Sequence, residues 1–189
     1  ISFEGKIENT NLSQLQNVDY LILTTPEMAI QANRIATYYE NNSSFNVEVV
    51  NINNIYNEFG SGSKDLTAIR DFITKLNNPL GTLKYVFILG DATYDYKNRI
   101  PNNFNIVSSY QSEESGNFVS SFVTDDYIVM TQPQNNLLIE NNLPDVPIGR
   151  IPASNVTEAG DMINKTLAYY NSLSGQSSPF GDWRMRLDF

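Results

Sequence analysis

The stretch Asp19-Tyr20-Leu21-Ile22-Leu23-Thr24-Thr25-Pro26 predicts the first strand of the fold and the start of its first helix. The short apolar run is typical of a strand that is buried on both faces. Thr25 is a favourable helix N-cap, and a proline such as Pro26 suits the first helical position. The apolar residues that follow recur at helical spacing and predict one inward-facing stripe: Met28, Ala32, Ile35, Ala36 and Tyr39.

A second strand follows this helix. Phe45, Val47 and Val49 occupy every second position, and together with Ile52 they predict this strand. A strand, a helix and a strand joined by short connections form a βαβ unit. We therefore expect the two strands to be parallel and the crossover to be right-handed.

The same pattern then occurs again. Residues 60–63, Gly-Ser-Gly-Ser, are expected to form a flexible link, and Ser63 can cap a helix over residues 64–76. The inward-facing residues of that helix are expected to be Leu66, Ile69, Phe72, Ile73 and Leu76. The apolar run of residues 85–89 predicts a third strand, which ends in Gly90-Asp91. Side chains just beyond the carboxyl end of such a strand line the ligand crevice of open parallel sheets.

Regularity is lost between Tyr94 and about Asn142. This polar stretch contains strand-like pieces at residues 106–110, 118–123 and 127–130. A loop region of this length inside a compact domain usually has a function or covers something. Residues 146–152 then predict a strand at a sheet edge, because their prolines cannot donate ladder hydrogen bonds.

A final helix is expected from Ser154 or Asn155, either of which can cap it, to about Tyr170. Its inward-facing residues are expected to be Met162, Ile163, Thr166, Leu167 and Tyr170. The fold class is therefore α/β, with a mostly parallel sheet of about four strands and helices on both faces, which makes three layers.

The chain is expected to divide into three parts. Residues 1–18 form a lead-in segment or linker, and residues 19–182 form the domain. Residues 183–189 begin a further strand, because Trp183, Met185, Leu187 and Phe189 alternate with polar residues. Since the chain begins at Ile1 and ends in that strand, we expect it to be a piece of a longer protein.

Composition disfavours several classes of function. With 12 basic and 21 acidic residues the net charge is −9, which repels nucleic acid and anionic lipid. No apolar run approaches the roughly 20 residues that span a bilayer. The chain has no Cys and no His, so it has no thiolate nucleophile, no imidazole base and no Ser-His-Asp triad.

Acidic residues gather at the expected strand ends and suggest a cation site. Asp91 and Asp95 follow the third strand, and Asp125 and Asp126 lie in the long irregular stretch. Oxygen ligands from several loops could hold Ca²⁺, although such carboxylates also cap turns and helices or stay solvated. Because Asp125 and Asp126 are adjacent, they would point to opposite faces of a strand and make a poor acid–base pair.

Several segments, taken in order, resemble the gingipain family of cysteine peptidases. They are residues 19–24, 55–62, 65–72, 83–95, 123–127 and 148–153, with Trp183-Arg184 near the end. The resemblance implies the first subdomain of a caspase-like module, with the catalytic Cys and His in a second subdomain downstream. It therefore implies no catalytic residue in this chain. It implies that the downstream subdomain is a partner and that the complete enzyme acts on secreted proteins. It also implies a secreted or cell-surface location and a link to Ca²⁺, which gingipains bind.

Two other classes of function stay open at this stage. The chain could be a stand-alone binding or scaffold domain of the same fold, or a small-molecule enzyme with a carboxylate site near Asp91. A reading frame that continues beyond Phe189 with a His and then a Cys, each after a strand, would distinguish the peptidase from the scaffold.

Overall fold

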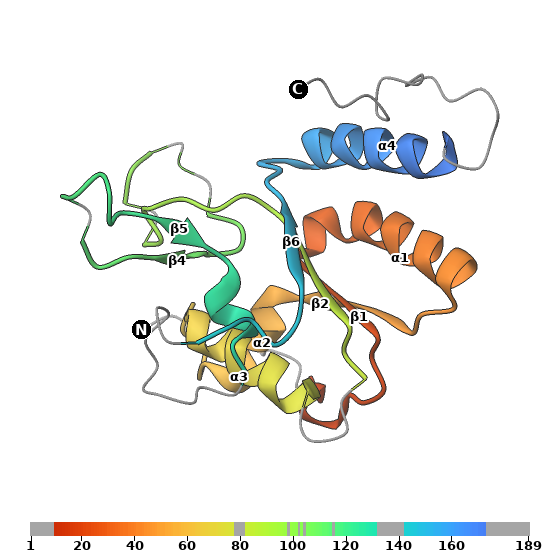
Figure 1. Cartoon of the computed structure of the whole chain (residues 1–189), viewed down its shortest axis with the longest axis horizontal. Coiled ribbons are helices and arrows are strands. Elements are labelled where there is room, and N and C mark those ends of the chain that lie inside the picture. Colours follow the sequence, from red (N-terminus) through yellow and green to blue (C-terminus); the bar gives the residue numbers. More distant parts are fainter. Residues whose placement is uncertain are drawn as a thin grey trace, which may run out of the picture.

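The computed structural model describes residues 10–77, 82–97, 99–101, 103, 105–114, 116–131 and 142–172. Their centre is a four-stranded sheet in the order β2-β1-β3-β6, in which all neighbours are parallel. The strands are β1 (Tyr20–Thr24), β2 (Val47–Asn51), β3 (Tyr85–Leu89) and β6 (Ile148–Ile151). The predicted α/β class, the parallel sheet of four strands and the edge position of β6 are confirmed (Figure 1).

Helices cover both faces of this sheet. The helices α1 (Ala29–Ser43) and α4 (Val156–Ser172) lie on one face, and α2 (Ile52–Phe59) and α3 (Leu66–Asn77) lie on the other (Figure 1). Side chains that alternate along the strands therefore enter two separate cores. Leu21 and Ile88 pack with α2 and α3, whereas Ile22 and Leu89 pack with α1 and α4.

The first predicted βαβ unit is present. Pro26 opens a 3₁₀ turn, η2 (Pro26–Met28), which continues directly into α1. Met28, Ala32, Ile35 and Ala36 are buried as the spacing predicts, and Tyr39 packs against the same core. None of the described helices is both long and apolar enough to cross a membrane.

The connection from β2 to α3 differs from the sequence prediction. Helix α2 was not expected; Asn51 caps it by accepting a hydrogen bond from the Asn53 amide at 3.0 Å. Residues 60–63 form a tight turn rather than a flexible link, because the amides of Gly60 and Gly62 both donate to the Tyr56 carbonyl.

The predicted cap of α3 was also wrong. The helix begins at Leu66 rather than at residue 64. Its cap is Asp65, whose carboxylate accepts the Thr67 amide at 2.9 Å, and not Ser63.

The long stretch after β3 is only partly as expected. Residues 106–110 and 118–123 contribute one end each to a short antiparallel hairpin of β4 (Tyr110–Gln111) and β5 (Val123–Thr124). Residues 127–130, predicted to be strand-like, lie mostly in the 3₁₀ helix η3 (Asp126–Val129), so that prediction was wrong.

The predicted cap of α4 is Asn155, whose side chain accepts the Glu158 amide at 3.0 Å. The Glu158 carboxylate in turn accepts the Ser154 amide at 2.8 Å, which gives the helix start two side-chain partners. In the lead-in segment, the 3₁₀ turn η1 (Leu12–Gln14) is held by Glu58 of α2, which accepts the Leu12 and Ser13 amides. The predicted strand of residues 183–189 lies outside the described residues.

Candidate functional site

The described chain leaves β3 at the carboxyl edge of the sheet through a backbone turn that only glycine fits. Gly90 has φ +147°, and a Cβ atom built on it would lie 2.6 Å from Cγ2 of Ile106. The next residue, Asp91, donates its amide to the Ala153 carbonyl and accepts the amides of Ile106 and Val107. The irregular stretch therefore leaves the edge of the sheet at Asp91 and is tied back to it at Ile106 and Val107.

Arg150 is the centre of this edge. It lies on β6, and its side chain is 12% exposed. Its guanidinium donates to both carboxylate oxygens of Asp125, at 2.8 Å and 2.7 Å. It also donates to the carbonyls of Gly90 at 2.7 Å and Val107 at 2.8 Å. One side chain thus joins β6, the end of β3 and two points of the irregular stretch.

This pair of charges is stable because each partner is well satisfied. Burial alone would raise the pKa of Asp125, but the hydrogen bonds and positive charge of Arg150 outweigh it, so the pKa lies below its ordinary value. Ser109 adds a further hydrogen bond to the same carboxylate at 2.6 Å. Asp125 is therefore an anion held by Arg150, and its role is to position Arg150 and the loop.

Two of the other predicted cation ligands, Asp91 and Asp95, accept backbone amides. Asp91 accepts the amide of its neighbour Ala92 at 2.8 Å, and Ser154 Oγ lies 3.5 Å from its second oxygen. Asp95 accepts the Ile100 amide at 2.7 Å, and this hydrogen bond is the main reason that its pKa is lowered. Asp126 begins η3. Within the described ranges, no group of three or more Asp, Glu, His or Cys residues is arranged to hold a metal ion.

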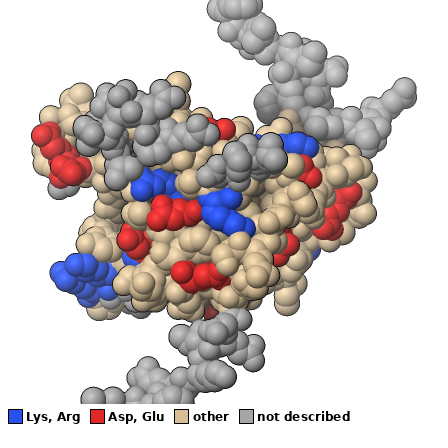
Figure 2. All heavy atoms as spheres, turned by 90° about the horizontal axis from the view of Figure 1, so that it is seen from below, with Lys and Arg blue, Asp and Glu red and all other residues tan. Residues whose placement is uncertain are grey.

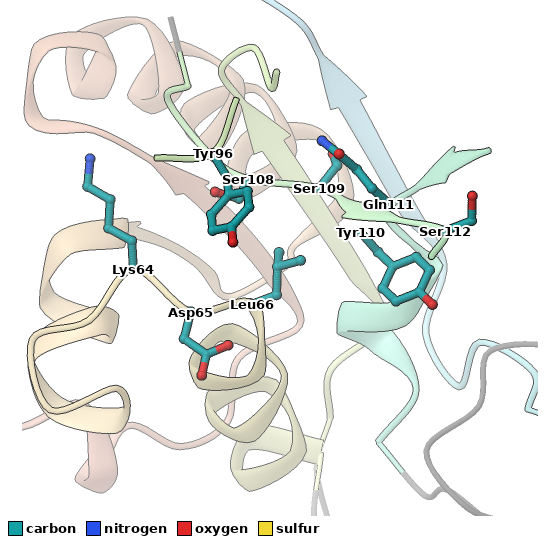
Figure 3. A pocket seen from close by; sticks show the side chains of 9 residues that line it. All are labelled: Lys64, Asp65, Leu66, Tyr96, Ser108, Ser109, Tyr110, Gln111 and Ser112. Atoms are coloured by element: carbon teal, nitrogen blue, oxygen red, sulfur yellow. The ribbon is translucent and has the colours of Figure 1, made fainter. Parts of the chain in front are cut away.

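A hollow of about 370 Å³ opens beside this edge (Figure 3). It lies between the start of α3 and the strand-like segment that leads into β4. In Figure 3 Tyr96 and Leu66 lie between these two walls. The residues that line the hollow are Lys64, Asp65, Leu66, Tyr96, Ser108, Ser109, Tyr110, Gln111 and Ser112.

The polar groups of this hollow are mostly engaged already. Ser109 donates to Asp125, Ser112 accepts the Phe122 amide, and Gln111 donates to the Thr93 carbonyl. Because the chain has no His and no Cys, none of these hydroxyls has an imidazole base beside it. Asp91 is not among the residues that line the hollow, so a carboxylate chemistry centred on Asp91 has no support from this cavity.

In Figure 2 acidic and basic side chains are scattered among other residues on the described part of this face. Sequence reasoning missed the role of Arg150, although one signal was present. An arginine in the middle of an otherwise apolar strand must find an anion when it is buried, and Asp125 lies 25 residues away in the chain.

Comparison with known proteins now defines the class of this chain. The model of Peptidase family C25 matches residues 13–189, so the chain belongs to this family of gingipain-like peptidases. It is similar to the crystal structure of dimeric latent PorU from Porphyromonas gingivalis, with 28% sequence identity and a TM-score of 0.78. The similarity covers 97% of this chain but 18% of that PorU chain, so this chain spans a small part of its length. No curated protein matches the sequence significantly.

Proposed function

We propose that this chain is the non-catalytic first part of a PorU-type cysteine endopeptidase, which removes C-terminal sorting signals from proteins secreted by the type IX system. The observation that carries the proposal is a contrast within the chain. It belongs to a peptidase family over residues 13–189, yet it contains neither Cys nor His. A thiolate nucleophile and its base would have to come from another part of the complete protein.

In this proposal the domain supports catalysis without taking part in the chemistry. The Arg150 contacts give the carboxyl edge of the sheet a fixed shape, and binding sites of open α/β sheets lie at that edge. The proposed partners are the catalytic part that follows in the chain and the secreted proteins that it cleaves. The proposed location is the outer-membrane cell surface or the secreted fraction, as for the family it resembles.

Peptide cleavage tests this proposal directly. The substrate is a secreted protein that carries its C-terminal sorting signal, incubated with the complete protein or with the chain of residues 1–189. We expect the complete protein to release the signal, a thiol-alkylating reagent to abolish release, and the chain alone to release none. Cleavage by the purified chain, or activity that survives alkylation of the complete protein, would contradict the proposal.

Calcium binding at the carboxyl edge stays a prediction. Asp125 is held by Arg150, and among the described residues no group of three or more Asp, Glu, His or Cys side chains is arranged to hold a metal ion. If Ca²⁺ binds the folded chain alone, millimolar Ca²⁺ should raise the melting temperature and Mg²⁺ should not. An unchanged melting temperature in both salts would remove calcium from the account.

A further inference from the structure

The hairpin strand β4 is paired with β5 along one edge only. Just after β4, Ser112 donates its amide to the Phe122 carbonyl, so the backbone groups of Ser112 point toward the β5 side. Because backbone groups alternate in direction along a strand, those of Ser109 and Gln111 point away from β5. Among the described residues, neither the hairpin ladder nor the surrounding backbone pairs with the amides of Ser109 and Gln111.

This second edge of β4 faces the start of α3 across the hollow of about 370 Å³. In Figure 1, β4 lies between β5 and the helices α2 and α3. Residues 108–112 all line the hollow, together with Leu66 at the start of α3. Since alternate side chains of a strand point to opposite faces, five consecutive lining residues indicate that the backbone edge itself forms this wall. The outward amides of Ser109 and Gln111 therefore face a hollow.

A strand edge beside a hollow is suited to receive one more strand. Its outward amides and carbonyls are a template for pairing, and many domains bind an extended peptide by adding it to such an edge. The added peptide would lie about 4.8 Å from β4. The volume of the hollow falls within the range of roughly 300–1,000 Å³ that is usual for ligand sites.

The other walls of the hollow indicate which peptide fits. Leu66 packs only partly against the core, and Tyr96 is 54% exposed. Both side chains lie between the two walls in Figure 3, so an apolar side chain of the peptide can cover them. Lys64 and Asp65 are adjacent, and their opposite charges favour neither an anionic nor a cationic ligand. An uncharged peptide with one apolar side chain therefore suits this hollow.

Backbone groups rather than side chains would make the hydrogen bonds to the peptide. Ser109 Oγ donates to Asp125, which Arg150 also binds, and Gln111 Nε2 donates to the Thr93 carbonyl. These side chains are therefore already engaged. The same contacts tie β4 to the irregular stretch, so the edge has its shape before a peptide binds, which lowers the cost of binding.

We propose that the outward edge of β4 binds an extended, uncharged segment of a substrate polypeptide by strand addition, with an apolar side chain of that segment against Leu66 and Tyr96. That the peptide is a substrate rests on the proposed function, whereas the strand-addition site rests on the geometry of β4. The chain belongs to a peptidase family but has neither Cys nor His. Holding the polypeptide that another part of the protein cleaves would give it a direct role in the complete enzyme.

Fluorescence anisotropy with the purified chain tests this proposal. The first probe is a capped pentapeptide of alternating threonine and leucine with an uncharged fluorophore. The second probe is the same peptide with N-methyl groups on its three central amides, which removes backbone donors and keeps every side chain. We expect the first probe to bind at least roughly tenfold more tightly, because two backbone hydrogen bonds are lost with the second. This comparison uses the unaltered chain.

Three variants locate the binding edge. Gln111→Pro removes an outward amide of β4, Gln111→Ala removes only the side-chain contact, and Val123→Pro removes an outward amide from the opposite edge of the same hairpin. Proline is tolerated on edge strands where its missing amide faces away from the ladder. We expect Gln111→Pro to weaken binding of the first probe at least roughly fivefold relative to Gln111→Ala, and Val123→Pro to leave binding unchanged. Melting temperatures show which variants are folded.

Equal affinity for the two probes would overturn the proposal in favour of a site that holds apolar side chains alone. No saturable binding of the first probe, or equal losses in folded Gln111→Pro and Val123→Pro, would overturn it as well. If the complete protein releases a sorting signal while the chain binds no probe, only the strand-addition site is wrong. If the probe binds as expected but the complete protein releases no signal, the proposed function is wrong and the site remains.

Discussion

The two edge strands of the described sheet, β2 and β6, differ in how they are protected against pairing. On β2, Glu48 stands beside Leu21 of β1, and burial raises the pKa of its carboxyl group. A charged side chain pointing inward at an edge opposes the addition of another strand. On β6 the only charged residue, Arg150, is already bound by Asp125, and Gly149 leaves open space. The edge strand β2 therefore keeps a charge that opposes a further strand, whereas the charge on β6 is already neutralised by Asp125.

The greatest loss of stability is expected on replacing Arg150, because its side chain joins β6 to the end of β3 and to the irregular stretch. Arg150→Met would leave Asp125 buried without its partner and would release the carbonyls of Gly90 and Val107. We expect the free energy of unfolding to fall by roughly 3 kcal/mol, measured by urea denaturation.

The matched control for this variant is Arg34→Met. Arg34 lies on α1 and donates to Gln31 and to the exposed side chain of Asn164. Its loss should cost less than about 0.5 kcal/mol. Equal losses for the two variants would show that Arg150 has no special part in holding the β6 edge.

The second prediction compares the loss of stability on substituting two glycines, Gly90 directly after β3 and Gly149 on β6. Gly90→Ala places a Cβ 2.6 Å from Ile106 at a φ of +147°, and we expect it to cost about 2 kcal/mol. Gly149→Ala meets nothing and should change stability by less than about 0.5 kcal/mol. Thermal unfolding of the two variants measures the difference. A large loss at Gly149 would mean that the space beside it is already filled by the chain.

The smallest change in stability is expected for the substitution of Glu48, which lies on the edge strand β2. Since its pKa in the folded state is raised, the folded protein binds the proton more tightly than the unfolded protein does. Glu48 therefore costs stability as pH rises through that raised pKa and costs nothing below the ordinary Glu pKa. Because the side chain is partly exposed, we expect Glu48→Gln to gain only a few tenths of a kcal/mol at neutral pH.

Urea denaturation from about pH 3.5 to about pH 7.5, which brackets the ordinary Glu pKa of about 4.3, checks this prediction. The gain should be absent at the acidic end and appear at the neutral end. The variant should also self-associate more than the parent chain, because the charge that protects β2 is gone. A gain that is largest at acidic pH would contradict the burial of Glu48.

Periodicity was a good guide where an element is long or buried on one face. The stripe from Met28 to Ala36 and the apolar run of β3 were both predicted, because their spacing reflects the burial that holds them in place. The helix of residues 52–59 was missed since it follows β2 without a break, and Ile52 was counted as part of that strand. Its signal was the Asn51 cap followed by apolar residues at positions 52, 55, 56 and 59.

The candidate site was harder to predict for a different physical reason. Acidic residues at strand ends were found, but their partners were not, because a hydrogen bond between Arg150 and Asp125 leaves no pattern in the local sequence. The sequence prediction named Asp125 as a possible cation ligand but did not foresee that Arg150 lies against it, and calcium binding stays a prediction. Family membership, in contrast, was predictable from several segments in order, which the match over residues 13–189 confirms.

We propose that the part of the complete protein that follows packs beside the outer edge of β6, and amide hydrogen exchange in the complete protein tests this proposal. The outward amides are those of Ile148 and Arg150 on β6 and those of Val47 and Val49 on β2. We predict that the β6 amides exchange at least roughly tenfold more slowly than the β2 amides, because only they would be covered by the part that follows. Fast exchange at Ile148 and Arg150, at the rate of the β2 amides, would contradict the account.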